Sequence, residues 1–430
     1  PMQAPGAYRA ASFAKFLPRF GYQVTVLTVS IDRFTWNGPI SPSKPNNTEI
    51  YRTRAANIAE IAKNLSQGKL TGHGTTRDEF TAMGAGLLKK TLAFCYDNFL
   101  TFPEPEWPWL ILGGRSALSI AKTIQPDILL SSALPVASHW IARKIKRQLQ
   151  IPWVGDYRDL WSHNHVRKRI GPMQALVSAM ERRLISDVDA LITVSEPLAE
   201  KLSETFIKPA HTVTNGYDPA EYPVTSEDIP GGWADTRKNA IYTGMIYTEQ
   251  QDPTPLFKAI LILIESGVMK EKDFALRFYG PNVDNVRCLL PPQLIDRFVF
   301  FGGNLPRSQA LHYQTKADLL IVLNWNDTHE RGVYTTKFFE YIGAGRPILS
   351  IGPQGGVVDN ALERTGRGVT ENDPVALAAI LDGFLKTGVL SKKNKTSDYA
   401  LKEEHLKHFT REYQAEKLAG ILDQMLIRSN

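Results

Sequence analysis

Residues 332–350 read GVYTTKFFEYIGAGRPILS, a polar loop followed by a short helix pattern, a turn of small residues and an apolar strand pattern. Lys337 and Glu340 are three positions apart, so both can lie on one helix face and reach the same ligand. Free N–H groups at a helix N-terminus favour anions, and a lysine in the first turn suits a phosphate. Glu340 can accept hydrogen bonds from a neighbouring diol such as a ribose. The alternative is an exposed helix face with two solvated charges.

Strand and helix patterns alternate on both sides of this stretch, which is typical of parallel sheets built from β-α-β units. The strands expected in the first half span residues 23–29, 127–133, 153–159, 190–195 and 212–215, and those of the second half span 239–245, 274–279, 298–301, 318–324 and 347–351. A polar stretch rich in proline and glycine, residues 217–236, predicts a linker. The pattern therefore predicts two α/β domains.

The expected boundaries are an N-terminal domain over 1–216, the linker over 217–236, a C-terminal domain over 237–400 and a final helix over 401–430. The first periodic segment, Ala7 to Phe20, predicts a helix where such a domain should open with a strand. We therefore expect a first strand upstream of Pro1.

Composition is that of an ordinary globular enzyme, with 22% charged and 43% hydrophobic residues among 430. Cys95 and Cys288 fit no metal spacing, which favours a reducing compartment. No apolar run approaches the ~20 residues of a membrane-spanning helix. Residues 1–215 hold 26 basic and 17 acidic side chains, a net +9, whereas the remainder holds 24 and 27, a net −3. The first half alone is therefore expected to meet an anionic partner.

The segment TTKFFEYIGAGRPIL, residues 335–349, resembles the donor-site segment of family 4 glycosyltransferases of the two-domain GT-B fold. It looks most like the branch that carries KLYEY-AAGRP in place of a pair of glutamates eight apart. Further matches lie in family order at residues 7–9 with 21–27, 153–161, 181–184, 193–196, 214–218 and 242–246.

The resemblance implies an α/β protein of the GT-B fold, in which two Rossmann-like domains with parallel sheets face a central cleft. The N-terminal domain would hold the acceptor and the C-terminal domain the donor, and the final helix would return to the N-terminal domain. Ligands of such sheets bind at the carboxyl ends of the strands. The donor-binding residues expected there are Gly244, Met245, Gly280, Asn304, Leu305, Thr335, Thr336, Lys337 and Glu340.

Two departures from the family pattern affect the donor side. Gly332 stands eight positions before Glu340, where many relatives have the first glutamate, so backbone groups of residues 332–335 would have to contact the donor sugar. Tyr247, Thr248 and Glu249 follow Gly244, where relatives often have basic residues.

The acceptor side is expected to include the loop residues Gly6, Ala7, Tyr8 and Arg9, which could alternatively form only a helix cap. Catalytic candidates are Asp156, Arg158 and Asp159, because a carboxylate can accept the proton of an incoming hydroxyl. The alternative is an Arg–Asp pair that fixes the following loop.

Three histidines and one acidic pair are further candidates for site residues. His139 is interpreted as structural, whereas His163 and His165 could reach the cleft. Asp187 and Asp189 have metal-binding spacing but lie at the wrong end of a strand, so no metal site is expected.

The predicted function is a retaining, metal-independent glycosyltransferase without a cofactor that uses a nucleotide-sugar donor. A nucleotide-sugar epimerase of the same fold and a non-enzymatic sugar-nucleotide-binding protein stay open as alternatives. Basic residues near tryptophans in the first half indicate a peripheral protein on the cytoplasmic face of an anionic membrane, and the alternative is a solvated helix face. These residues are Arg143, Lys144, Lys146, Arg147 and residues 167–169. The acceptor would then be lipid-linked, in surface or capsular polysaccharide synthesis, and nucleic acid is not expected.

Overall fold

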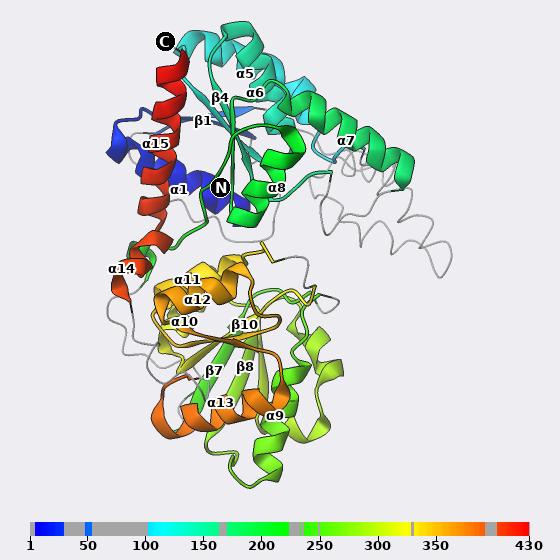
Figure 1. Cartoon of the computed structure of the whole chain (residues 1–430), viewed down its shortest axis with the longest axis vertical. Coiled ribbons are helices and arrows are strands. Elements are labelled where there is room, and N and C mark those ends of the chain that lie inside the picture. Colours follow the sequence, from blue (N-terminus) through cyan, green and yellow to red (C-terminus); the bar gives the residue numbers. More distant parts are fainter. Residues whose placement is uncertain are drawn as a thin grey trace, which may run out of the picture. The chain divides into compact units, whose positions relative to one another are not determined.

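The computed structural model describes residues 5–29, 48–53, 102–162, 170–222, 233, 236–247, 250–327, 331–391 and 402–429. It divides into two compact units, residues 1–214 with 415–430 and residues 215–414 (Figure 1). The division falls just before the stretch predicted as a linker. Trp233, inside that stretch, is buried in a core of the second unit.

The described elements of the first unit alternate between helices and strands along the chain. They are α1 (Pro5–Phe16), η1 (Leu17–Phe20), β1 (Thr25–Val29), β2 (Glu49–Thr53), α5 (Pro108–Ile124), β3 (Leu129–Ala133), α6 (Ala137–Leu149), β4 (Trp153–Tyr157), α7 (Gly171–Ile185), β5 (Ala190–Thr193), α8 (Glu196–Phe206), β6 (Ala210–Thr212) and most of α15 (Arg411–Ser429). Strands β1 and β2 form one parallel sheet, and β3-β4-β5-β6 form another.

Strand β4 is buried on both faces because its side chains alternate between two cores. Val154 packs with Phe13 and Phe16 of α1 and with Leu418 and Leu422 of α15. On the other face, Trp153 and Tyr157 pack with residues of α7 and α8. The last helix of the chain therefore supplies part of the core of the first unit (Figure 1).

The second unit has one parallel sheet in the order β12-β11-β10-β7-β8-β9. Its elements are η4 (Pro219–Glu221), β7 (Lys238–Thr243), α9 (Thr254–Glu265), β8 (Phe274–Tyr279), η5 (Val283–Leu289), η6 (Pro292–Leu294), β9 (Val299–Gly303), α10 (Arg307–Lys316), β10 (Leu319–Leu323), α11 (Thr336–Ala344), β11 (Ile348–Ile351), α12 (Val357–Thr365), β12 (Gly368–Glu371), α13 (Pro374–Thr387), α14 (Glu403–Leu406) and η7 (Lys407–Phe409). One core lies under α9 and α13, and a second lies under α11 and α12.

The predicted α/β class with parallel sheets is confirmed, and the ten expected strands correspond to β1 and β3–β11 with shifted ends. The largest shift is β6, expected at 212–215 and found at Ala210–Thr212. Strands β2 (EIYRT) and β12 (GVTE) were not predicted; polar residues interrupt the apolar pattern in both.

Candidate functional site

The order of strands in the second unit creates a switch point between β7 and β10. From β7 the chain adds β8 and β9 on one side, then returns to add β10, β11 and β12 on the other. Helices that follow neighbouring strands on opposite sides of such a point diverge, which leaves room for a ligand at the carboxyl ends. The loop after β7 begins with Gly244, and the segment after β10 leads to α11.

Lys337, in the first turn of α11, reaches across this switch point. Its Nζ donates a hydrogen bond to the carbonyl oxygen of Met245 at 2.9 Å and lies 4.8 Å from the ring centroid of Tyr242. Burial lowers the pKa of Lys337 to about 8, an effect that the negative charge of Glu340 opposes. Lys337 is therefore charged at pH 7, and its ammonium is directed at the loop between two central strands.

The neighbouring loops approach each other at glycines with positive φ. Gly244 has φ +114°, and a Cβ there would lie 3.1 Å from the Lys337 side chain. Gly280 has φ +156°, and a Cβ there would lie 2.2 Å from the carbonyl oxygen of Gly244. The Gly280 N–H donates to the carbonyl oxygen of Gly303, which links the end of β9 to the same edge. A side chain at position 280 would force these loops apart.

The N-terminus of α11 adds backbone donors to this edge. Thr335 is the N-cap with φ −81° and ψ 147°, and its side chain makes no capping hydrogen bond. Its Oγ1 is buried without a hydrogen-bond partner in the described part of the chain. N–H groups at the start of a helix, a threonine hydroxyl and a lysine ammonium together form a donor set for phosphate.

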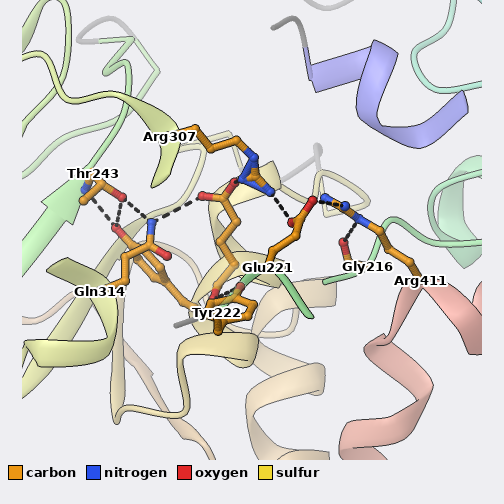
Figure 2. A network of polar contacts seen from close by, with 9 residues as sticks. Gly216, Glu221, Tyr222, Thr243, Arg307, Gln314 and Arg411 are labelled. Carbon is orange, nitrogen blue, oxygen red and sulfur yellow. Dashed lines mark hydrogen bonds and ion pairs between the residues drawn. The ribbon is translucent and has the colours of Figure 1, made fainter. Parts of the chain in front are cut away.

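Glu340 lies one turn further along α11 and is held by two side chains of α10. Arg307 Nη1 donates to Oε1 at 2.8 Å, and Gln314 Nε2 donates to Oε2 at 3.3 Å. Both donors belong to α10, and Figure 2 draws Arg307 and Gln314 with dashed lines for their hydrogen bonds. The same network continues through Gln314 to Thr243 at 2.9 Å, and from there to the hydroxyl of Tyr341. Sequence reasoning missed Arg307 and Gln314, because no local pattern marks partners 33 and 26 positions away.

Three residues predicted on the donor side remain, of which Thr336 is the half-buried first residue of α11, and the other two differ in exposure. Asn304 is exposed directly after β9. Leu305 instead is partly buried and packs against the core under α11. Its side chain thus contributes to packing.

In the first unit, Asp156 and Arg9 form a buried ion pair. The guanidinium donates to both carboxylate oxygens, at 2.9 Å from Nη2 to Oδ1 and 3.0 Å from Nε to Oδ2. Ser132 Oγ donates to Oδ2 at 2.7 Å, and Asp156 is 0% exposed. Two residues predicted separately are thus brought together, and the pair ties α1 to the end of β4.

Arg158 and Asp159 lie at the same strand end in different surroundings. Arg158 Nε donates to the carbonyl oxygen of Ala133 at 2.7 Å, and Nη2 donates to that of Leu134, which holds the turn after β3. Asp159 is exposed. It is therefore the accessible carboxylate of the predicted catalytic group.

The expected acceptor-side loop is helical. Gly6, Ala7, Tyr8 and Arg9 all lie in α1, which begins at Pro5. The prediction of a loop at these residues was wrong, whereas the helix predicted over Ala7 to Phe20 corresponds to α1 and η1. Proline fits the first turn of a helix, and the alanines that follow favour its continuation.

The histidine interpreted as structural is fully buried. His139 Nδ1 lies 2.7 Å from Ser131 Oγ, which accepts a hydrogen bond from Trp153 Nε1. Burial lowers the pKa of His139 to about 4, so the ring is neutral at pH 7. His163, His165 and residues 167–169 lie outside the described residues.

Asp187 and Asp189 are ion-pair partners of α6. Asp187 pairs with Arg143 at 2.7 Å and with Arg147 at 2.5 Å, and Asp189 pairs with Lys146. Three of the four α6 residues expected on a membrane-facing surface are thus neutralised locally, and Lys144 is the exposed one without a salt bridge in the described residues. Within the described ranges, no cluster of three or more histidine, cysteine or acidic side chains is arranged to hold a metal ion.

An apolar cavity of about 280 Å³ lies between α5, α6 and α7 of the first unit. It is lined by Pro103, Glu104, Trp107, Leu110, Ala137, Trp140, Trp161 and Met180. Its one carboxylate, Glu104, accepts hydrogen bonds from the backbone N–H groups of Val136 and Ala137 at 2.6 and 2.5 Å. Among the helices the structure describes, none is long and apolar enough to cross a membrane.

Comparison with known proteins agrees with this architecture. Residues 90–221 match the model of Glycosyltransferase Family 4. No curated protein matches the chain significantly by sequence. Sucrose-phosphate synthase from Thermosynechococcus elongatus has a similar structure, with a TM-score of 0.63 at 12% identity over 99% of this chain and 94% of that chain.

Two further structures are similar over nearly their whole length. A trehalose-6-phosphate synthase, an enzyme of glycosyl transfer with retention, gives a TM-score of 0.56 at 12% identity over 94% of this chain and 99% of that chain. Anabaena HepE in complex with UDP-glucose gives 0.51 at 12% identity over 93% and 99%. The chain has the GT-B fold, and together with the family match this supports a glycosyltransferase of the GT-B type.

Proposed function

We propose that the protein is a glycosyltransferase that moves a sugar from a nucleotide-diphosphate sugar to an acceptor hydroxyl. The observation that carries the proposal is the Lys337 ammonium at the β7–β10 switch point, beside the glycine loop at Gly244 and the N-terminus of α11. This arrangement suits a diphosphate, whose negative charge grows as the bond to the sugar breaks. Anabaena HepE, of the same fold, is known in complex with UDP-glucose.

In this proposal each part of the site has one task. Lys337 and the N–H groups at the start of α11 bind and neutralise the diphosphate leaving group. Glu340 accepts hydrogen bonds from the ribose hydroxyls, and backbone groups of residues 332–335 contact the sugar. A fixed cation takes the place of a metal ion, so transfer is metal-independent. The similarity to trehalose-6-phosphate synthase supports retention of the anomeric configuration.

On the acceptor side, we assign contact with the acceptor hydroxyl to Asp159, the exposed carboxylate of the strand-end group. Arg158 and the Arg9–Asp156 pair fix the loops around it.

We further propose that the acceptor is lipid-linked and belongs to surface or capsular polysaccharide synthesis. The tryptophan-lined cavity of about 280 Å³ supports an acceptor with an apolar part. Ile111 and Leu112 on α5 are 61% and 48% exposed, and Arg115 follows on the same helix, which supports peripheral contact with an anionic membrane.

The donor proposal is tested by calorimetry with UDP, GDP and ADP. We expect one of the three to bind, and Lys337→Ala to weaken its binding by about 1.5–3 kcal/mol through loss of a charge-assisted contact. Lys386→Ala is the control, because Lys386 is a lysine of the same unit with a 67% exposed side chain. Equal binding by parent and Lys337→Ala would refute the site.

The reaction itself is tested by release of nucleoside diphosphate from the donor. Release that depends on an added lipid-linked or saccharide acceptor supports the transferase. Interconversion of the donor sugar without an acceptor would indicate the epimerase instead, and binding without turnover the non-enzymatic alternative.

The membrane proposal is tested by sedimentation with anionic vesicles. Ile111→Asp should weaken binding, whereas Val375→Asp should not, although Val375 of α13 is similarly exposed at 66%. Binding should also fall as salt rises, since salt screens the attraction. A protein that ignores these vesicles at low salt contradicts this part of the proposal alone.

A further inference from the structure

Helix α10 presents two side chains to the Glu340 carboxylate. Arg307 and Gln314 are seven positions apart, two helical turns, and therefore lie on the same face of α10. One donates to Oε1 and the other to Oε2. Gln314 is 0% exposed, and the side chains of Arg307 and Glu340 are 19% and 18% exposed. Both oxygens of the carboxylate are therefore held in place from within the fold.

The guanidinium of Arg307 is itself held by a second carboxylate. Its Nη2 donates to Oε2 of Glu221 at 2.7 Å, and the second oxygen of Glu221 accepts from Arg411 Nη1 at 2.7 Å. Arg411 Nε also donates to the carbonyl oxygen of Gly216 at 3.0 Å. Figure 2 shows Arg411, Glu221 and Arg307 in a row. The hydrogen bond from Arg307 to Glu340 extends this row, so that positive and negative side chains alternate along it. The planar guanidinium of Arg307 thus bridges two carboxylates and cannot turn away from Glu340 without losing both.

This arrangement leaves the Glu340 carboxylate able to accept further hydrogen bonds. A carboxylate has about four lone-pair directions, and the two donors of α10 use one on each oxygen. The remaining directions can receive the two hydroxyls of a ribose. Because the carboxylate is already fixed, little rotational freedom is lost when the ribose binds.

We propose that Arg307 is a positioning residue for the nucleotide: it orients the Glu340 carboxylate toward the ribose diol without contacting the nucleotide itself. The proposal rests on the donor function proposed above. It also explains why a carboxylate can stand one turn from the phosphate-binding Lys337, since the guanidinium offsets its charge against the incoming diphosphate.

The test compares ribonucleotides with analogues that lack the diol. Calorimetry would measure binding of UDP, GDP and ADP, each beside its 2′,3′-dideoxy form, to the parent and to Arg307→Met, Arg307→Lys and Glu221→Gln. We expect Arg307→Met to weaken ribonucleotide binding by about tenfold while changing dideoxynucleotide binding less than about twofold. Arg307→Lys should fall between the two, because lysine keeps the charge but not the two-ended fork.

Glu221→Gln should give a smaller loss of the same kind, and it keeps the test valid if Arg307→Met does not fold. Arg297→Met is the control, an exposed arginine of the same unit that pairs with Glu271. Equal losses for both nucleotide forms, or none for either, would overturn the positioning role. In a further outcome, Lys337→Ala loses nucleotide binding, but the parent binds ribonucleotides and dideoxynucleotides equally well. That outcome would retain the phosphate site and overturn this inference. Absence of nucleotide binding to the parent would overturn both.

Discussion

The two units each hold a prominent charged site, and the two sites are built in opposite ways. In the first unit, Asp156 is fully buried and Arg9 and Ser132 occupy both carboxylate oxygens. In the second, Lys337 is only partly buried and donates to a single backbone carbonyl, that of Met245. At the same edge of the sheet, Thr335 Oγ1 has no hydrogen-bond partner in the described residues. The first site is closed and suits a structural role, whereas the second retains binding capacity.

The difference shows that charge density at a strand end does not identify a catalytic group. Asp156 and Asp159 are three positions apart, yet one is enclosed and the other exposed. Asp156 lies within the buried strand β4 and meets Arg9 from α1, whereas Asp159 lies beyond the end of the strand. The variants below test whether the closed site stabilises the fold and the open site binds ligand.

The largest expected effect is on the closed site. Asp156→Ala would leave Arg9 buried without its carboxylate, and we expect a loss of about 3–5 kcal/mol in the free energy of unfolding of the first unit. Urea unfolding followed by tryptophan fluorescence measures this, since Trp153 lies on the same strand. Glu271→Ala breaks the exposed pair with Arg297 and should cost less than about 1 kcal/mol. A similarly small loss for Asp156→Ala would contradict the structural role.

For the open site we expect stability and binding to move in opposite directions. Burial depresses the pKa of Lys337 to about 8, so between about pH 8 and 10.5 the unfolded chain binds more protons than the folded one. Folding is therefore opposed by this charge at pH 7, and Lys337→Met should raise the melting temperature of the ligand-free protein. The same variant should lose the stabilisation that a nucleoside diphosphate gives the parent. A lower melting temperature for ligand-free Lys337→Met would show that Lys337 supports the fold.

The affinity for a nucleotide sugar should also depend on the protonation of Lys337. The phosphate contact requires the protonated ammonium, so affinity for a nucleotide sugar should be full below about pH 8 and fall as pH rises through that value. Calorimetry between pH 6.5 and about 9.5 would measure this, given an ordinary lysine pKa of about 10.4. Lys337→Arg stays charged over the whole range and should bind with a flat profile. A parallel decline in both proteins would assign the titration to another group.

The smallest effect on stability is expected at the exposed carboxylate beside the closed pair. Asp159→Asn should change the free energy of unfolding by less than about 0.5 kcal/mol, as is usual for surface positions. It should nevertheless lower the rate of transfer to the acceptor while leaving nucleotide binding intact. Asp127→Asn, another carboxylate near a strand of this unit, is the control. Unchanged transfer by Asp159→Asn would remove it from the acceptor site.

The sequence allowed the α/β class and most of the strands to be predicted, because apolar runs such as Leu319–Leu323 carry a clear signal. Lys337 and Gly244 were both predicted as donor residues, and the structure places them in contact. The partners of Glu340 could not be predicted, because Arg307 reaches it only through the packing of α10 against α11. The pairing of Arg9 with Asp156, 147 positions apart, is hidden for the same reason.

The return of α15 to the first unit sets an order for folding during synthesis. Residues 215–414 are continuous, so the second unit can complete its cores as soon as they leave the ribosome. The first unit, although its translation begins earlier, lacks Ala415, Leu418 and Leu422 until residues 215–414 have been translated. Until then, the apolar surface of α1 and β4 that these side chains cover stays open to water or to a chaperone. Of the two units, the one whose translation begins first is therefore completed last.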